Sequence, residues 1–249
     1  MLIKTDLIYH NMYAGPHLEN KNLVLALDAA SPKSYPGSGT TWTDLTGKGL
    51  NATLYNGPTF STDNFGTIVF DGDDDYGQIG SSPLTAITVL TFELWVNRTA
   101  IATNTPPYDR IFQKDGGVSG YPAWGWTLAE SNPAAPQTLS AYGGGSGEAN
   151  STISFTSDAN MSLDEWNCYT TSIGPISSGE YPIRNYFNGK LNSSGTIDNE
   201  VLDTQDVIRI AIGDGREFKG KIPIVRLYNK VLTDGEVEQN YNAFKNRFK

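Results

Sequence analysis

The chain has 249 residues, a formal net charge of −9 at pH 7 and one cysteine, Cys168. The charge argues against nucleic acid as a partner, because binding to phosphates needs clustered Lys and Arg side chains and the sequence has no such cluster. One cysteine excludes an intramolecular disulfide bond, and its apolar setting predicts a small buried side chain. No segment approaches the roughly 18 apolar residues of a membrane-spanning helix, so membrane insertion is not expected.

The first 21 residues form a segment of their own. They show little hydrophobic periodicity and contain both histidines of the chain, His10 and His17. We interpret them as an arm that orders on a partner, with an unstructured terminus as the alternative. The segment lacks the continuous apolar stretch of a secretory signal, which predicts synthesis in a cytoplasm without export. The apolar side chains of the arm are Leu2, Ile3, Leu7, Ile8 and Tyr9.

Downstream of the arm, short apolar segments alternate with turn-forming residues. Residues 23–27 predict a first buried strand, and residues 52–55 predict a short strand that ends at the turn dipeptide Asn56-Gly57. In residues 90–96 and again in residues 207–212, apolar side chains recur at every second position, which places them on one face of a strand. Strands of this length and spacing are typical of an antiparallel sandwich or jelly roll.

The densest acidic run is the sequence Asp-Gly-Asp-Asp-Asp at residues 71–75, between two predicted strands. It lacks the later Glu of an EF-hand calcium loop. We interpret the run as a turn with solvated carboxylates. A bound cation is the alternative, because it would relieve the repulsion between the carboxylates.

The C-terminal segment predicts a strand followed by a helix. Thr233 and Glu236 have the spacing of a capping box, in which each side chain accepts a hydrogen bond from a free backbone N–H of the first helical turn. Apolar residues then recur at helical spacing, among them Val237, Tyr241 and Phe244. This pattern predicts one terminal helix over residues 233–247.

Six sequence blocks occur in the order found in concanavalin-A-like, laminin-G-like jelly-roll domains, and the chain resembles that family. The resemblance implies an all-β fold, a two-sheet antiparallel jelly-roll sandwich with an N-terminal arm (residues 1–21) and one C-terminal α-helix. It implies a single domain over residues 22–249, of a kind that mostly binds ligands and only sometimes catalyses. The blocks are residues 70–76, 91–96, 111–114, 165–169, 186–191 and 220–239.

The two ends of the domain, residues 23–45 and 240–249, resemble the version of this domain found in tailed-phage virion proteins. This second resemblance implies a structural, decoration or fibre protein of the virion, made in the host cytoplasm. The arm would dock to other virion proteins, and the lectin-like domain would face outward. The oligomeric state stays open, a homo-oligomer included.

The family resemblance also implies a calcium site at one rim of the sandwich, where loops between strands hold the ion. The loops that match carry Asp115 in one case, and Asp214 with Glu217 in the other. Carboxylate oxygens are ligands that Ca²⁺ prefers. The alternative is that the Asp-Gly pairs at 115 and 214 only form turns.

Aromatic residues beside glycine-rich loops are candidates for a glycan platform, because aromatic rings stack on the apolar faces of sugars. We select Trp124 and Tyr142, with Trp124 at the rim of the sandwich and Trp126 in its core. The alternative assigns all these rings to the core, since large aromatic side chains dominate core packing. The expected ligand is a glycan of the host surface.

A catalytic function is not expected from the carboxylates. Retaining glycosidases need two carboxyl groups about 5 Å apart. The related glucanases carry them as Glu-x-Asp-x-x-Glu, a pattern that the sequence lacks, and Glu93 is the single acid of its predicted strand. We therefore predict a non-enzymatic virion protein that binds host glycans. The alternative is a soluble lectin or a glycan-active enzyme that is not attached to a particle.

Overall fold

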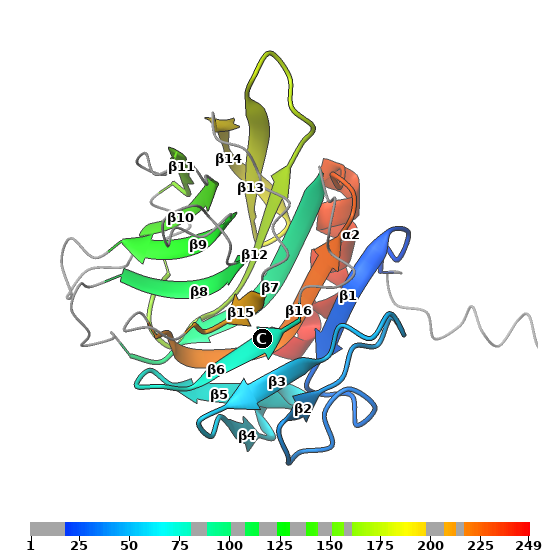
Figure 1. Cartoon of the computed structure of the whole chain (residues 1–249), viewed down its shortest axis with the longest axis vertical. Coiled ribbons are helices and arrows are strands. Elements are labelled where there is room, and N and C mark those ends of the chain that lie inside the picture. The colour runs from blue at the N-terminus through cyan, green and yellow to red at the C-terminus, as the bar shows by residue number, and fades with distance from the viewer. Residues whose placement is uncertain are drawn as a thin grey trace, which may run out of the picture.

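Two antiparallel β-sheets face each other in the computed structural model of the chain (Figure 1). This arrangement confirms the predicted all-β sandwich with one C-terminal helix. Most turn residues with positive φ are Gly or Asn, the residue types that adopt this conformation most readily. The structure describes residues 18–80, 89–100, 108–114, 124–129, 138–143, 151–156, 161–197, 207–212 and 217–249.

Sheet A contains the two longest described strands, β7 and β16, at its centre. Strand β7 pairs with both β12 and β16, and β16 pairs in addition with β5 and β1, so most neighbours in space are distant in sequence. In spatial order its described strands are β14 (Lys190–Ile197), β13 (Tyr181–Phe187), β12 (Trp166–Ile173), β7 (Leu90–Arg98), β16 (Lys219–Tyr228), β5 (Thr67–Asp71) and β4 (Thr59–Ser61), with β1 (Leu23–Asp28) on β16.

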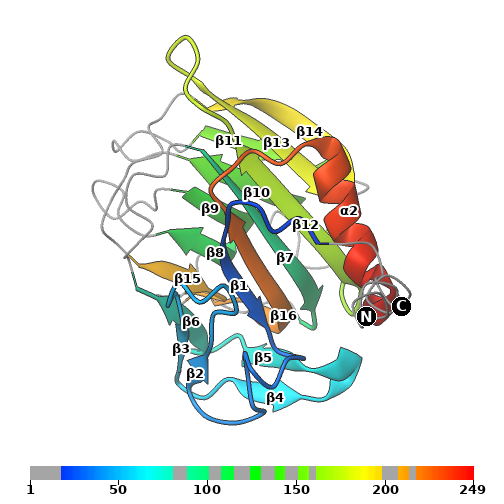
Figure 2. The same ribbon diagram turned by 90° about the vertical axis from the view of Figure 1, so that its right-hand side faces the viewer.

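Sheet B consists of shorter strands and lies across the core from sheet A (Figure 2). Its strand β15 is shorter than the predicted strand over residues 207–212, because Ala211 adopts a left-handed conformation with φ 55° that ends the extended backbone. In spatial order the described strands are β11 (Ser151–Ser154), β10 (Thr138–Gly143), β9 (Trp124–Ala129), β8 (Tyr108–Lys114), β15 (Ile208–Ile210), β6 (Tyr76–Ile79), β3 (Ala52–Tyr55) and β2 (Thr41–Trp42).

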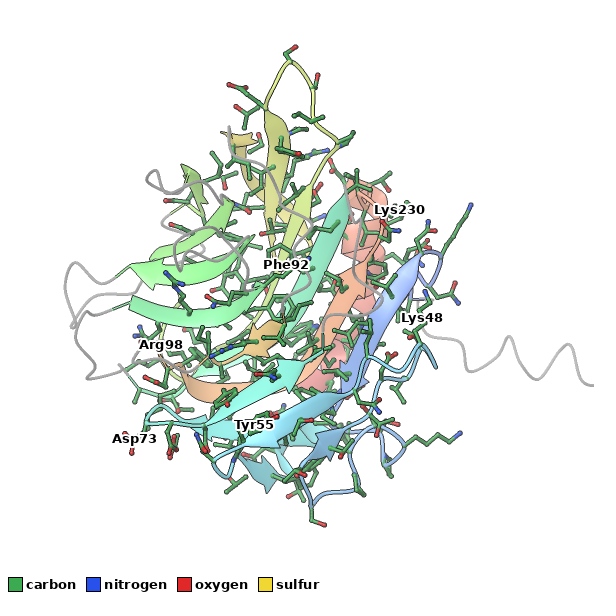
Figure 3. The ribbon with its side chains drawn as sticks, viewed as in Figure 1. Lys48, Tyr55, Asp73, Phe92, Arg98 and Lys230 are labelled. Carbon is green, nitrogen blue, oxygen red and sulfur yellow. The ribbon has the colours of Figure 1, made fainter. Side chains whose placement is uncertain are left out.

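The hydrophobic core lies between the sheets, where alternation along each strand directs one set of side chains inward. Phe92 of β7 is fully buried, and its ring centroid lies 5.6 Å from that of Phe112 on sheet B (Figure 3). Burying a side chain of this size stabilises the fold by about 1.5–3 kcal/mol. At one end of β7, Arg98 reaches across to Asp109 of β8 in a buried ion pair of 3.2 Å, so a charged contact also joins the sheets.

Helix α2 (Asp234–Phe244) packs on the outer face of sheet A, away from sheet B (Figure 2). The predicted capping box at its start is confirmed: Glu236 N–H donates to Thr233 Oγ1, and Thr233 N–H donates to the Glu236 carboxylate. The helix continues as a 3₁₀ turn, η4 (Lys245–Phe248), close to the predicted end at 247. No helix in the described part of the chain is long and apolar enough to cross a membrane.

Aromatic rings fix α2 and η4 to sheet A. Trp95 of β7 stacks on Tyr241 of α2 and on Phe248 of η4, with centroid separations of 5.5 and 4.2 Å. Cys168 of β12 belongs to the same cluster and is buried, as its sequence context predicts. Burial is also the main reason why the pKa of the Cys168 thiol lies well above its ordinary value, so it is held as an unreactive thiol.

The N-terminal arm is described only from residue 18 onward. Glu19 N–H donates to Asn240 Oδ1 of α2 at 2.9 Å, so the last residues of the predicted arm lie against the helix before β1 begins. The apolar residues predicted to dock, from Leu2 to Tyr9, lie outside the described residues. Their role stays a prediction.

Candidate functional site

The outer face of sheet B differs from that of sheet A, because no helix of the described chain covers it (Figure 2). The cross-strand register lines up four polar residues on neighbouring strands. Ile208 and Ile210 flank Arg209 and enter the core, so Arg209 points outward. We call the following four residues the polar row: Gln113 of β8, Arg209 of β15, Gln78 of β6 and Thr53 of β3.

A pair of aromatic rings lies beside the polar row on the same face. Tyr55 of β3 and Tyr76 of β6 are in register, and their rings stack 4.9 Å apart with an interplanar angle of 14°. Alternation produces this placement, because Ala52 and Leu54 point into the core and leave Tyr55 outside. Tyr55 is 38% exposed, and the Arg209 guanidinium lies 5.7 Å from the centroid of the Tyr76 ring. We call Tyr55 and Tyr76 the aromatic pair.

A β-bulge places a second arginine on this face. The register of β8 against β9 shifts between Arg110 and Phe112, and the Ile111 carbonyl at the shift accepts the Ala211 N–H at 2.8 Å. The extra residue lets Phe112 point into the core while Arg110 and Gln113 share the outer face. Arg110 Nη1 donates to Gln113 Oε1 at 3.1 Å, so this guanidinium is joined directly to the polar row.

The acidic run at 71–75 forms a tight turn between β5 and β6, as predicted. Asp73 N–H donates to Asp71 Oδ1 at 2.9 Å, and Gly72 adopts φ 74°, a conformation that suits glycine. Asn56 Nδ2 donates to the Asp74 carbonyl at 2.7 Å, which holds the turn at the end of β3 and β6 beside the aromatic pair (Figure 3). The turn is therefore part of the rim of the outer face.

The prediction of solvated carboxylates is wrong for one member of this turn. Asp75 is only 4% exposed, and one of its carboxylate oxygens accepts the Asp71 N–H at 3.0 Å. Burial, with repulsion from Asp71 and Asp74, raises the pKa of Asp75 to about 6. Carboxylate oxygens of Asp71, Asp74 and Asp75 lie within 4.8 Å of one another, a spacing at which the three could hold a cation, so the cation alternative for this run stays a prediction.

The residues that sequence reasoning selected for glycan binding lie in the same sheet. Trp124 begins β9 and pairs with Lys114 of β8, whereas Tyr142 of β10 pairs with Gly125. Gly125 also pairs with Gln113, so position 142 is in register with the polar row. Position 124 is in register with Lys114, the next residue of β8. The side chains of both residues lie outside the described part of the structure, so their role stays a prediction.

Of the three residues predicted to hold calcium, only Glu217 is described. It lies just before β16 and is 6% exposed, so its carboxylate is buried at the edge of the sandwich. Asp115 and Asp214 lie outside the described residues. The calcium site therefore stays a prediction.

The buried acids of the strands that the structure describes are engaged in ion pairs. Glu93 of β7 is fully buried and accepts a hydrogen bond from Arg226 Nη1 of β16 at 2.5 Å. The Arg226 guanidinium lies 4.1 Å from the centroid of the Phe244 ring of α2, so this ring covers the ion pair on the side of the helix. Asp109 is held by Arg98 between the sheets. These two carboxylates therefore have structural partners within the sandwich.

Sequence reasoning missed the aromatic pair and the polar row. The signal was present in two short segments, residues 52–55 and 76–79, where polar or aromatic residues alternate with apolar ones or glycine. Two-residue periodicity predicts that Tyr55, Tyr76 and Gln78 point away from the core. Which strands become neighbours cannot be obtained from that period, and only the β3–β6–β15–β8 order joins these residues into one surface.

Comparison with known families gives a match over more than half of the chain. Residues 71–238 match the sequence model of the Laminin_G_3 family, which is described as the Concanavalin A-like lectin/glucanases superfamily. No curated protein matches the chain in sequence.

Solved structures with the same fold include two binding domains of larger size than this chain. The binding domain of Paraclostridial Mosquitocidal Protein 1 superposes with a TM-score of 0.70 at 15% identity, over 91% of this chain and 53% of its own. The binding domain of botulinum neurotoxin DC, solved in complex with rat synaptotagmin II, gives 0.65 at 16% identity, over 90% and 52%. The chain thus spans about half the length of these toxin domains.

A carbohydrate-related structure matches over almost its full length. Domain 4 of AbnA, a GH43 extracellular arabinanase from Geobacillus stearothermophilus solved in complex with arabinotriose, gives a TM-score of 0.59 at 16% identity. The match covers 88% of this chain and 98% of that domain. At these identities the likeness concerns the fold.

Proposed function

Because this chain belongs to the Concanavalin A-like lectin/glucanases superfamily, we propose that it is a non-enzymatic binding domain that recognises a glycan on the outer face of sheet B. The observation that carries the proposal is the aromatic pair beside the polar row, on a face that no helix of the described residues covers. An exposed ring offers an apolar surface to a sugar, and the neighbouring side chains of Thr53 and Gln78, which are exposed and partly exposed, offer hydrogen bonds to its hydroxyls. The predicted contact of Tyr142 would extend this surface onto β10, because position 142 is in register with Gln113 through Gly125.

The burial and the ion pairs of the strand carboxylates support the non-enzymatic part of the proposal. Glu93 and Asp109 are each held by an arginine and are fully buried, which leaves neither available to a glycosidic bond. The three acids at the rim belong to a turn, and they share one short segment rather than facing each other across a groove. General acid and nucleophile roles need two positioned carboxyl groups on opposite sides of the scissile bond.

The finer part of the proposal assigns the domain to a tailed-phage virion. The support is the resemblance of residues 23–45 and 240–249 to virion proteins of this fold. In this proposal the chain is made in the host cytoplasm, the apolar residues of the arm attach it to other virion proteins, and the sandwich faces outward toward host glycans. Calcium bound by Asp115, Asp214 and Glu217 remains part of the proposal, with a rise in melting temperature on addition of calcium as its test.

The glycan part is tested with a matched pair of aromatic substitutions. Tyr55→Ala removes the exposed ring of the aromatic pair, whereas Phe65→Ala removes a ring that is 80% exposed at the β4–β5 turn of sheet A. We expect Tyr55→Ala to weaken glycan binding about three- to tenfold and Phe65→Ala to leave it unchanged. A glycan array followed by calorimetric titration measures this. Equal binding by all three proteins, or hydrolysis of the bound glycan, would contradict the proposal.

The virion part is tested by deleting residues 1–20. We expect the deletion to leave a folded sandwich with unchanged glycan binding that no longer enters particles, because the residues removed precede the first strand. Incorporation is measured by protein analysis of purified particles, and folding by circular dichroism. Normal incorporation after the deletion would favour the alternative, a lectin that is not attached to a particle through its arm.

A further inference from the structure

The aromatic pair leaves one ring face open to a ligand. Tyr76 has neighbours on both sides, the Tyr55 ring of β3 at 4.9 Å and the Arg209 guanidinium of β15 at 5.7 Å. Tyr55 has Tyr76 against one side of its ring, and the residue is 38% exposed. Because β3 lies between β6 and β2 (Figure 1), the other face of Tyr55 is directed toward β2.

A glycine lies across from Tyr55 on this open side. The ladder that pairs β2 with β3 continues one residue before β2, where the Leu54 N–H donates to the Thr40 carbonyl at 2.7 Å. The next position in this register places Gly39 opposite Tyr55. Gly39 adopts φ 96°, and a Cβ atom built on it would meet nothing within 4 Å beyond its two chain neighbours. The glycine therefore keeps the space beside the ring clear of a cross-strand side chain.

Both sides of this space are fixed before a ligand arrives. The hydroxyl of Tyr35, a buried residue, donates to the Gly39 carbonyl at 2.8 Å and holds the backbone in place. Tyr76 supports the Tyr55 ring from behind. A surface whose parts are already held loses less conformational entropy when it binds.

The two segments that flank the open face carry hydroxyl groups and no charge. Residues 36–42 and 51–57 contain no Asp, Glu, Lys or Arg, although 18% of the chain is charged. Thr41 and Thr53 are exposed and are paired across β2 and β3 on the outer face. The acidic turn at 71–75 joins β6, so it lies on the side of the aromatic pair that is away from β2.

Resting on the proposed glycan function, we infer that the ligand presents an uncharged sugar unit whose apolar face stacks on the β2-facing side of Tyr55, above Gly39. The hydroxyls of Thr41 and Thr53, each a donor and an acceptor, bind hydroxyls at the edge of this sugar. A carboxylate or ammonium group on the same unit would lose hydration without gaining a charged partner, which is unfavourable. Gly39 and Thr53 thereby determine which sugars the site accepts.

A glycan array sorted by charge tests the ligand class. The full chain is screened against neutral, carboxylate-bearing and amine-bearing glycans, and the strongest neutral glycan is titrated at about 20 and about 500 mM sodium chloride. We expect the neutral glycans to bind most tightly and their affinity to change less than about twofold with salt, because no ion pair forms. Binding through Tyr55 that requires a carboxylate or an amine on the glycan overturns the inference.

Nuclear magnetic resonance locates the sugar relative to the ring. On titration with the strongest neutral glycan of the array, backbone amide shifts should be largest in residues 39–41 and 53–55, because these residues border the β2-facing side of Tyr55. Largest shifts in β6 and β15 would place the sugar on the opposite side of the aromatic pair and overturn the inference.

One pair of variants tests the space above Gly39. Gly39→Asn places a side chain beside the open face, and asparagine tolerates positive φ better than most residues. We expect it to weaken binding of the neutral glycan about tenfold. The matched control is Gly49→Asn, which adds the same side chain at an exposed glycine with φ 80° in the loop between β2 and β3. It should leave the affinity unchanged.

A second pair tests the hydroxyl group and keeps the inference testable if Gly39→Asn does not fold. Thr53→Val removes a hydroxyl and keeps the shape of the side chain, so it should weaken binding about three- to tenfold. Thr59→Val changes an exposed threonine of β4 in sheet A and should have no effect. Thermal unfolding shows that each variant used is folded.

The outcomes separate this inference from the proposed function. If a neutral glycan binds in a Tyr55-dependent way but is unaffected by Gly39→Asn and Thr53→Val, the inference is overturned and the glycan function stands. A Tyr55-dependent preference for charged glycans has the same meaning. If no glycan on the array binds, both the inference and the glycan function are overturned.

Discussion

Each outer face of the sandwich is formed by strands whose side chains alternate inward and outward, but in the described chain a helix covers only one of the two faces. On sheet A the outward side chains include Trp95 and the Glu93–Arg226 pair, and α2 covers them. On sheet B the outward side chains include Tyr55 and Arg209, and no described helix lies over them (Figure 2). Both faces carry aromatic rings and arginine, so residue type alone does not distinguish them.

The difference lies in what each arginine contacts. Arg226 has a buried carboxylate below it and the ring of Phe244 above it, which satisfies its charge within the fold. On sheet B the guanidinium of Arg209 lies 5.7 Å from the centroid of the Tyr76 ring, and the neighbouring Tyr55 ring is 38% exposed. The side chains under α2 are buried and contribute to stability, whereas the exposed ring of Tyr55 can contact a ligand. Changes on sheet A should therefore alter stability, and changes on sheet B should alter binding.

The largest expected effect comes from the buried pair under α2. Glu93→Leu leaves the Arg226 guanidinium buried without its carboxylate, and loss of one partner of such a pair costs about 3–5 kcal/mol. The double variant Glu93→Leu/Arg226→Met should recover most of that loss, because it removes both charges. Urea unfolding of the single and double variants measures this. Costs that add in the double variant would contradict the pairing, and a change in glycan affinity would contradict the separation of the two faces.

A smaller effect on stability is expected at the acidic turn that joins β5 of sheet A to β6 of sheet B, and it depends on pH. The pKa of Asp75 in the folded chain is about 6, above the ordinary value of 3.8. Ionisation of Asp75 therefore disfavours the folded state. The contribution of the protonated carboxyl group to the free energy of unfolding is complete below the ordinary pKa of 3.8 and is lost as pH rises through 6. We expect Asp75→Asn to raise the free energy of unfolding by about 1–2 kcal/mol at pH 7 and to have little effect at pH 4.

The comparison for this change is Asp73→Asn, which alters an exposed neighbour in the same turn. Urea unfolding at the two pH values gives the difference between each variant and the parent, so that contributions from other carboxyl groups cancel. A stabilisation by Asp75→Asn that is equal at both pH values would show that its carboxyl group is not the one that titrates. If Asp75→Asn and Asp73→Asn raise the free energy of unfolding equally, the net charge of the turn, and not the burial of Asp75, explains the stabilisation.

Sequence reasoning succeeded where the signal is local. The capping box of Thr233 and Glu236 depends on a spacing of three residues. The Asn56-Gly57 turn after β3, with φ of 68° and 116°, depends on two residues that tolerate positive φ. The alternation in β7 predicts its inward face without knowledge of any partner strand. Each of these features is encoded within a few neighbouring residues.

The candidate site could not be predicted in the same way, because it is assembled from strands that are distant in sequence. Tyr55 and Arg209 belong to strands separated by more than half of the chain, and β15 inserts between β6 and β8. Arg110 joins the face through a β-bulge, which reverses the inward and outward sense of β8 at one residue. Neither the order of strands nor the position of a bulge can be predicted from the hydrophobic periodicity of a single segment.

The smallest expected effect comes from a change that weakens the start of α2, the helix that covers sheet A. Thr233→Ala removes the hydroxyl that accepts the Glu236 N–H, and loss of such a cap costs about 1 kcal/mol. Because the chain has one cysteine and it is buried under α2, the rate of Cys168 labelling reports how often the helix leaves the sheet. Local opening that is easier by 1 kcal/mol speeds labelling about fivefold. Thr233→Ser keeps a hydroxyl and should label at nearly the parent rate. Glycan binding on sheet B should be the same in all three proteins, and a matching loss of affinity in Thr233→Ala would show that the two faces are coupled.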